Sequence, residues 1–176
     1  MSRYVALVRG LGGRYTIAMK DLVAILQRLG LKDVKTYIAS GNAVFSAGSL
    51  DAGKVGARIT AAIERKRGFA PPVIVRTQSE LERAIAANPF PQAETAPTSL
   101  HLVFLARKPR APDFAPLDRL LKPNERYVLK GQVFYFHAPD GVGRSDAFRR
   151  IEKTVGLGTA RNWRTVRTLQ AMLAEA

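Results

Sequence analysis

The segment with the clearest chemical potential is the loop Asp140-Gly-Val-Gly-Arg-Ser145. Gly143 leaves its backbone N–H accessible and Arg144 supplies a cation, while Ser145 can cap a following helix whose N-terminus carries partial positive charge. Such an arrangement can hold a phosphate or a carboxylate. The spacing and the lysine of a P-loop are absent, and of the two interpretations an ordinary strand-to-helix turn with a serine cap is favoured.

A second candidate lies in Thr159-Ala-Arg-Asn-Trp-Arg-Thr165, which we expect to begin a helix. Arg161 and Asn162 are predicted to contact an anionic ligand, and an arginine beside an aromatic ring also suits base stacking. Trp163 is spaced with the apolar residues that follow it as in a helix, so we assign it to the core. Thr159 or Asn162 is expected to cap this helix.

Two further candidates lie near the beginning of the chain. Arg9 follows an apolar segment and precedes Gly10, so it places a cation at a sheet edge beside a flexible loop. It could equally pair with an internal carboxylate. Asn42 ends the sequence Ser40-Gly-Asn42, where its amide could bind a ligand or could simply belong to a hairpin turn.

No catalytic or metal-binding signature is recognisable. The chain contains no cysteine and only two histidines, which excludes disulfides and thiolate metal sites. His101 and His137 lie on separate predicted strands without a ligand partner at i+2 or i+4, and strand-end histidines are more often structural. We therefore expect no metal and no cofactor, and whether the protein is an enzyme is left open.

The charge balance points to an anionic partner. Lysine and arginine total 28 against 14 aspartate and glutamate residues, a net charge of +14 in 176 residues. Nucleic acid is the commonest polyanionic partner of such proteins. The excess is spread evenly, with +8 in residues 1–88 and +6 in residues 89–176, so it is also compatible with a background bias. The local maximum is residues 144–167, with seven basic and two acidic side chains.

Elements that position these residues can be read from apolar spacing and turn signals. The first 90 residues predict an α+β, ferredoxin-like β-α-β-β-α-β arrangement, in which two helices cover one face of an antiparallel sheet. Its expected elements are residues 3–9, 19–29, 34–39, 43–46, 51–67 and 72–76. Thr77-Gln-Ser-Glu80 fits a capping box that opens a further short helix.

The second half predicts a smaller antiparallel sheet and C-terminal helices. A turn-rich stretch over residues 91–99 is the best candidate boundary, which gives subdomains 1–90 and 91–176, packed as one unit. Beyond it we expect a strand, a short helix, a hairpin and two final helices. No internal repeat is visible among the residues.

Three sequence blocks together resemble a bacterial family of unknown function, domain-of-unknown-function (DUF) family 1697. They are Ala6-Leu-Val-Arg-Gly10 with Gly12-Gly13, Thr36-Tyr-Ile-Ala-Ser-Gly-Asn42, and Gly141-Val-Gly-Arg-Ser145 with Thr159-Ala-Arg-Asn-Trp163. The first loop is two residues shorter than is usual in the family, and Tyr15 stands where an asparagine is expected. The resemblance implies an α+β, ferredoxin-like, cytoplasmic protein and no established reaction.

These observations together favour a binding protein for a phosphate-bearing partner, RNA or DNA in the first place. The alternatives are an enzyme or sensor for a small anionic metabolite held in a cleft between the halves, and a structural or partner-binding module. No apolar run reaches the roughly 20 residues needed to cross a bilayer, and no signal peptide is recognisable, so we expect a cytoplasmic protein without a membrane contact.

Overall fold

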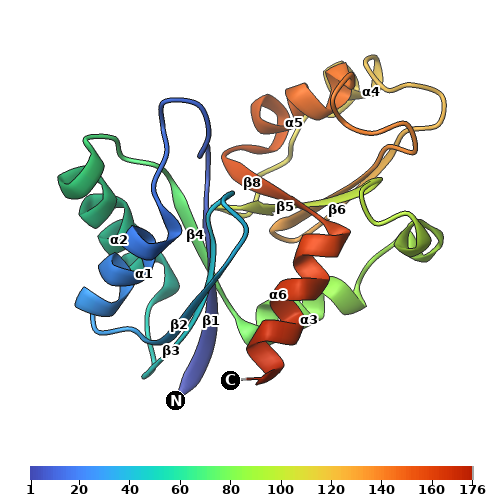
Figure 1. Ribbon diagram of the computed structural model, residues 1–176. Helices are drawn as coiled ribbons and strands as arrows, with labels where there is room; N and C mark the ends of the chain where they lie inside the picture. Colours follow the sequence, from blue (N-terminus) through green and yellow to red (C-terminus); the bar gives the residue numbers. More distant parts are fainter. Residues whose placement is uncertain (176) are drawn as a thin grey trace. The chain divides into compact units, whose positions relative to one another are not determined.

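A computed structural model of the chain describes residues 1–175, which fall into two compact units. The first unit contains Met1–Arg83 together with the residues from Thr168 onward, and the second contains Ala84–Arg167. Each unit has its own four-stranded antiparallel sheet (Figure 1). None of the helices described is long and apolar enough to cross a membrane.

The first unit has the predicted ferredoxin-like arrangement. Its elements are β1 (Ser2–Val8), α1 (Met19–Arg28), β2 (Lys32–Tyr37), β3 (Asn42–Ala47), α2 (Ala52–Arg67) and β4 (Val73–Thr77). The strands lie in the order β2-β3-β1-β4, and every neighbouring pair is antiparallel. This confirms the β-α-β-β-α-β order expected from the sequence.

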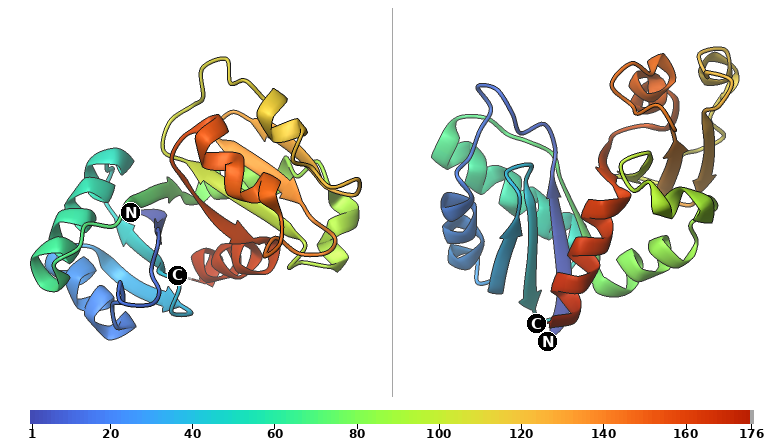
Figure 2. Two further views of the ribbon diagram at one scale, coloured as in Figure 1. Left: turned by 90° about the horizontal axis from the view of Figure 1, so that it is seen from above. Right: turned by 45° about the vertical axis from the view of Figure 1, so that its right-hand side comes forward.

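The core of the first unit lies between its sheet and the helices α1 and α2, which share one face of the sheet (Figures 1 and 2). Tyr4, Ala6 and Val8 point to this face because side chains alternate along β1. Leu22 and Ile59 reach the same core from the two helices and are fully buried. The outer sides of α1 and α2 carry polar residues, and many of the basic side chains of this unit lie on these two helices.

Local signals define the ends of both helices. Gly30 follows α1 with φ of +83°, and Gly68 ends α2 with φ of +78°, a left-handed conformation that glycine adopts without strain. Asp51 caps α2 by accepting a hydrogen bond from the Lys54 backbone N–H at 3.0 Å. Residues at the helix ends therefore determine where these two helices begin or end.

The second unit repeats the topology of the first. After η1 (Pro91–Thr95) come β5 (Leu100–Leu105), α4 (Ala115–Asp118), β6 (Arg126–Lys130), β7 (Val133–His137), α5 (Asp146–Val155) and β8 (Gly158–Asn162). The strand order β6-β7-β5-β8 corresponds position by position to β2-β3-β1-β4. Each sheet is also followed by a helix, α3 (Gln78–Ala86) after β4 and α6 (Trp163–Glu175) after β8. The chain thus contains a structural repeat that no residue pattern revealed.

Strand β8 is the strand that the sequence did not predict. Residues 159–165 were expected to begin a helix, but residues 158–162 pair with β5 and the helix starts at Trp163. Gly158 permits this pairing, because a Cβ there would lie 2.8 Å from the Val103 side chain and 2.9 Å from that of Leu105. Trp163 is only 4% exposed, which confirms its place in the core.

The helices that directly follow β4 and β8 are capped in related ways. Thr77 and Glu80 form the predicted capping box, in which each backbone N–H donates to the other residue's side chain, at 2.8 and 3.1 Å. In the second unit the Asn162 side chain accepts from the Thr165 backbone N–H at 2.9 Å. Asn162 is therefore the cap of α6, one of the two residues proposed for that role.

Candidate anion-binding site

The helix layer of the first unit carries an unbalanced positive charge. Within α1 and α2 there are seven basic and two acidic side chains. In contrast, α4 and α5 of the second unit together carry three of each sign. An even charge distribution along the sequence therefore becomes uneven once the helices are placed on the surface.

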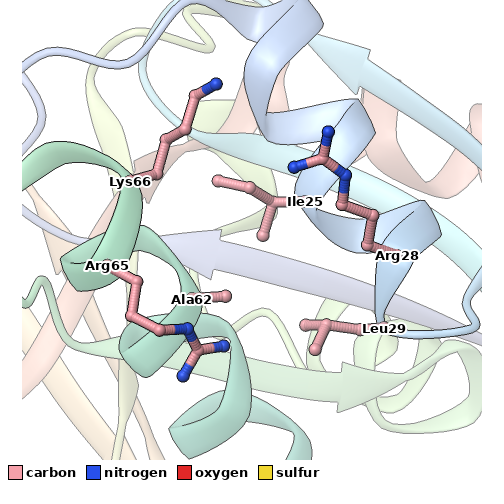
Figure 3. Close-up of a pocket in the computed structure, with 6 residues that line it drawn as sticks. All are labelled: Ile25, Arg28, Leu29, Ala62, Arg65 and Lys66. Carbon is pink, nitrogen blue, oxygen red and sulfur yellow. The ribbon is translucent and has the colours of Figure 1, made fainter.

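A pocket of about 320 Å³ lies between α1 and α2 and collects part of this charge. Arg28 from α1 and Arg65 and Lys66 from α2 surround an apolar centre formed by Ile25, Leu29 and Ala62 (Figure 3). Across the residues that the structure describes, none of these three cations has a hydrogen bond or an ion pair. Their charges are therefore compensated only by solvent.

Local helix electrostatics explain part of this grouping. Arg65 and Lys66 lie in the last turn of α2, and Arg28 in the last turn of α1, where cations interact favourably with the helix dipole by about 0.3–1 kcal/mol each. That effect does not remove the repulsion between like charges around one pocket. In Figure 3 the Arg65 guanidinium points to the side opposite those of the Arg28 and Lys66 head groups, and a guanidinium matches phosphate oxygens with paired donors.

Arg9 and Asn42 lie at one end of the first unit's sheet. Leu7 pairs with Asn42, and the Val8 N–H donates to the Gly41 carbonyl at 2.8 Å, so Arg9 follows directly beside this turn. Asn42 is fully buried, and its Nδ2 donates to the Tyr37 carbonyl at 3.1 Å and to the Ser40 hydroxyl at 2.9 Å. The Asn42 amide thus holds the hairpin turn, while a ligand contact from Arg9 stays a prediction.

The glycine loop of the second unit leads into α5 as expected. Ser145 is fully buried and caps the helix, with its Oγ accepting from the Phe148 N–H at 3.0 Å. The Gly143 carbonyl accepts a hydrogen bond from Arg149 at 2.7 Å. Arg144 is exposed. The serine-cap interpretation is confirmed, and anion binding by this loop stays a prediction carried by Arg144.

Replacing Ser145 tests how much of its role is capping. We expect Ser145→Ala to lower the free energy of unfolding by about 1 kcal/mol, because the Phe148 N–H loses its acceptor. Ser145→Gly should lower the free energy of unfolding by only a few tenths of a kcal/mol. Urea unfolding followed by circular dichroism measures both variants, and equal losses in both would contradict the capping role.

Arg161 and Asn162 project to opposite faces of the second unit's sheet. They are consecutive residues of β8, paired with Leu102 and His101 respectively, and side chains alternate along a strand. Arg161 is 9% exposed, donates to the Thr159 hydroxyl at 2.7 Å, and has its pKa lowered to about 10 by burial. A single site on one face cannot use both side chains, so the pair is divided between two environments.

His101 faces the same side as Asn162 and lies under α5. Its ring centroid is 5.3 Å from that of Phe148 in an edge-on arrangement, and its Nδ1 is buried without a hydrogen-bond partner. Burial lowers the pKa of His101 to about 4, so the ring is neutral at physiological pH. A neutral, enclosed imidazole suits packing better than proton transfer to a ligand in solution.

The predicted site residues separate into two groups. Arg9 and Asn42 belong to the first unit, and Gly143, Arg144, Ser145, Arg161 and Asn162 belong to the second. The basic pocket contains none of these seven. One signal for it was present in the sequence, the run Arg65-Lys-Arg67 at the end of a predicted helix, but only the packing of α1 beside α2 adds Arg28. No group of three or more His, Cys, Asp or Glu that could hold a metal occurs among the described residues.

Comparisons with known proteins identify a family of unknown function and a similar solved structure. A family model described as "Protein of unknown function (DUF1697)" matches residues 1–135. Among solved structures, the chain is similar to the conserved bacterial protein SP0830 from Streptococcus pneumoniae, with a TM-score of 0.70 and 21% identity over 98% of both chains. At this identity the likeness shows a shared fold alone. No curated protein matches the chain.

Proposed function

We propose that this chain, which belongs to the DUF1697 family of proteins of unknown function, binds a phosphate-bearing polymer, RNA or DNA. The contact surface is the α1–α2 layer of the first unit. The observation that carries the proposal is the grouping of Arg28, Arg65 and Lys66 around one pocket without an acidic partner among the described residues. Lysine and arginine side chains contacting phosphates supply most non-specific affinity for nucleic acid.

The extent of the charge favours a polymer over a small anion. Helix α2 has 16 residues, so it is about 24 Å long, several times the spacing of successive phosphates along a strand. Lys54 and Arg58 precede Arg65 by whole numbers of helical turns to within about 20°, so they continue the positive charge along the same side of α2. A small phosphorylated metabolite would need the pocket only, and the pocket volume of about 320 Å³ makes this the alternative to be separated by experiment.

Removing the three pocket cations tests the proposal. The triple variant Arg28→Ala/Arg65→Ala/Lys66→Ala should bind labelled single- and double-stranded oligonucleotides about tenfold or more weakly than wild type in fluorescence anisotropy. A salt series gives the second readout. Each lost phosphate contact flattens the dependence of log K on log salt by about 0.7–0.9, so the slope should change by about 2–3.

A matched variant removes the same charge elsewhere. Arg107, Lys108 and Arg110 are exposed on the loop that follows β5 in the second unit. Replacing these three by alanine should weaken binding less than the pocket variant does. Equal losses in both variants would show that net charge and not the pocket determines binding, and absence of wild-type binding at low salt would exclude the proposal.

The metabolite alternative has its own readout. A thermal-shift screen with inorganic phosphate, nucleotides and sugar phosphates detects a specific small ligand, because bound ligand stabilises the folded state in proportion to the logarithm of its concentration above Kd. Stabilisation by one such compound, lost in the pocket variant and unaccompanied by oligonucleotide binding, would favour the alternative.

A further inference from the structure

The loop between β1 and α1 presents an aromatic ring to solvent. Gly12 and Tyr15 exchange two backbone hydrogen bonds of 3.0 Å, which close a tight turn with Gly13 at φ of +56°. Tyr15 is 45% exposed and is the only aromatic residue among the large apolar side chains left exposed in the described chain. The turn therefore holds one ring at the surface.

Two neighbours fix the orientation of this ring. The Arg14 guanidinium lies 5.1 Å from the Tyr15 ring centroid, and the Phe69 ring meets Tyr15 edge-on with centroids 5.5 Å apart. Such contacts restrict the rotation of the Tyr15 side chain before any ligand binds. A preoriented ring loses less conformational entropy on binding than a free one.

The loop that carries the ring is hydrogen-bonded to the last turn of α2. Arg67 Nε donates to the Thr16 carbonyl at 3.0 Å, which ties the last turn of α2 to the loop. Arg65 and Lys66 of the pocket are the two preceding residues. In Figures 1 and 2 the loop after β1 and the segment before β4 project from the same end of the first unit. Cations and an exposed aromatic ring thus share one region of this unit.

We infer that Tyr15 is a stacking platform for an unpaired base, so that the protein recognises nucleic acid in single-stranded form. This inference rests on the proposed function. Positive charge that follows the backbone, combined with an aromatic ring that stacks on a base, is how proteins hold single strands without reading their sequence. A duplex keeps its bases stacked on one another, so a ring on a short turn gains nothing from it. The Arg14 guanidinium lies over the Tyr15 ring and adds a planar cation to the stack.

The experiment compares single strands with duplexes. Anisotropy titrations use a labelled oligonucleotide and its hairpin duplex, with wild type, Tyr15→Leu, Tyr15→Phe and the exposed-residue control Leu120→Ala. Tyr15→Leu should weaken single-strand binding about tenfold while leaving the duplex affinity and the salt slope unchanged. Tyr15→Phe and Leu120→Ala should bind as wild type does. A 2-aminopurine base in the single strand should be quenched by wild type and less so by Tyr15→Leu.

The outcomes separate this inference from the proposed function. If wild type binds both forms with a steep salt dependence and Tyr15→Leu changes neither, the stacking role is excluded and the phosphate surface stands. Equal weakening of single strand and duplex would likewise overturn it, because a distorted loop and not a lost stack would be responsible. If wild type binds neither form, the proposed function fails and this inference with it.

Discussion

Acidification from about pH 7.5 to pH 4 should lower the free energy of unfolding by about 3 kcal/mol through His101 alone, since burial lowers its pKa from 6.5 to about 4. The imidazole is enclosed by Phe148, 5.3 Å away between centroids, and Phe136 and Asn162 stand opposite it on the neighbouring strands. No acidic side chain is among these neighbours to stabilise an imidazolium. Protonation therefore requires charging a partly buried ring whose Nδ1 atom is buried and has no hydrogen-bond partner.

The sign of the effect follows from proton binding. The unfolded chain takes up a proton on His101 below its ordinary pKa of 6.5, whereas the folded chain does so only near pH 4. Between these values the unfolded state binds more protons, so stability is complete above about pH 7 and decreases as the pH falls. Urea unfolding at a series of pH values measures this decrease.

Replacing His101 isolates its contribution to the pH dependence of the free energy of unfolding. His101→Phe cannot titrate and can keep an edge-on contact with Phe148, so its stability should vary less with pH than that of wild type. His137, whose pKa is also lowered by burial and by Arg126, is replaced by asparagine in a separate control. Parallel pH profiles for wild type and His101→Phe would contradict the assignment.

Truncation of Phe136 should lower the free energy of unfolding by about 3–5 kcal/mol, the usual cost of removing a fully enclosed phenyl ring. Phe136 is completely buried in the middle of the second unit's sheet, and its ring lies 5.5 Å from that of Phe148. Alanine there leaves a cavity under α5. A loss of this size is a large fraction of the 5–15 kcal/mol that typically stabilises a protein.

Chemical denaturation of Phe136→Ala, Phe136→Leu and Leu157→Ala measures this effect. The leucine variant keeps most of the apolar volume and should lose less than the alanine variant. Leu157 is 37% exposed, so its truncation provides a surface control with a small loss. A loss below about 1 kcal/mol in Phe136→Ala would show that the core collapses to fill the cavity.

The fold of the first unit was predictable because local and periodic signals agree there. Leu22, Ile25 and Leu26 recur at helical spacing, and Gly30 marks the end of the same helix. Strand β2 was placed slightly too late, at residues 34–39 instead of 32–37; Ile38 has a φ of +47°, so the extended backbone ends at Tyr37. The error concerns the ends of the strand and not the type of element.

Strand β8 could not be predicted from its own residues. Thr159-Ala-Arg-Asn162 has no apolar alternation, and Asn162 and Trp163 give genuine helix-start signals for the residues that follow. What makes the segment a strand is the unpaired edge of β5, a partner more than 50 residues away in the chain. Tertiary pairing decided the conformation here, as it often does where local preference is weak.

The candidate site was harder to predict than the fold. The sequence placed the strongest charge at residues 144–167, but in the second unit Asp146 and Glu152 offset two of the three basic residues of α5, and Arg161 is buried. The basic pocket depends on two helices separated by more than 20 residues lying side by side. Charge counted along a chain does not show which cations share a surface.

The composition of the first unit bears on how the protein is made. This unit takes residues from both ends of the described chain, and the Arg3 guanidinium donates to the Leu173 carbonyl at 2.6 Å, a separation of 170 residues. Domains usually fold as they leave the ribosome, the N-terminal one first. Here the segment from Thr168 onward is synthesised last, so a nascent chain stalled before Thr168 has the sheet and core of the first unit but lacks its final helical segment and the contact with Arg3.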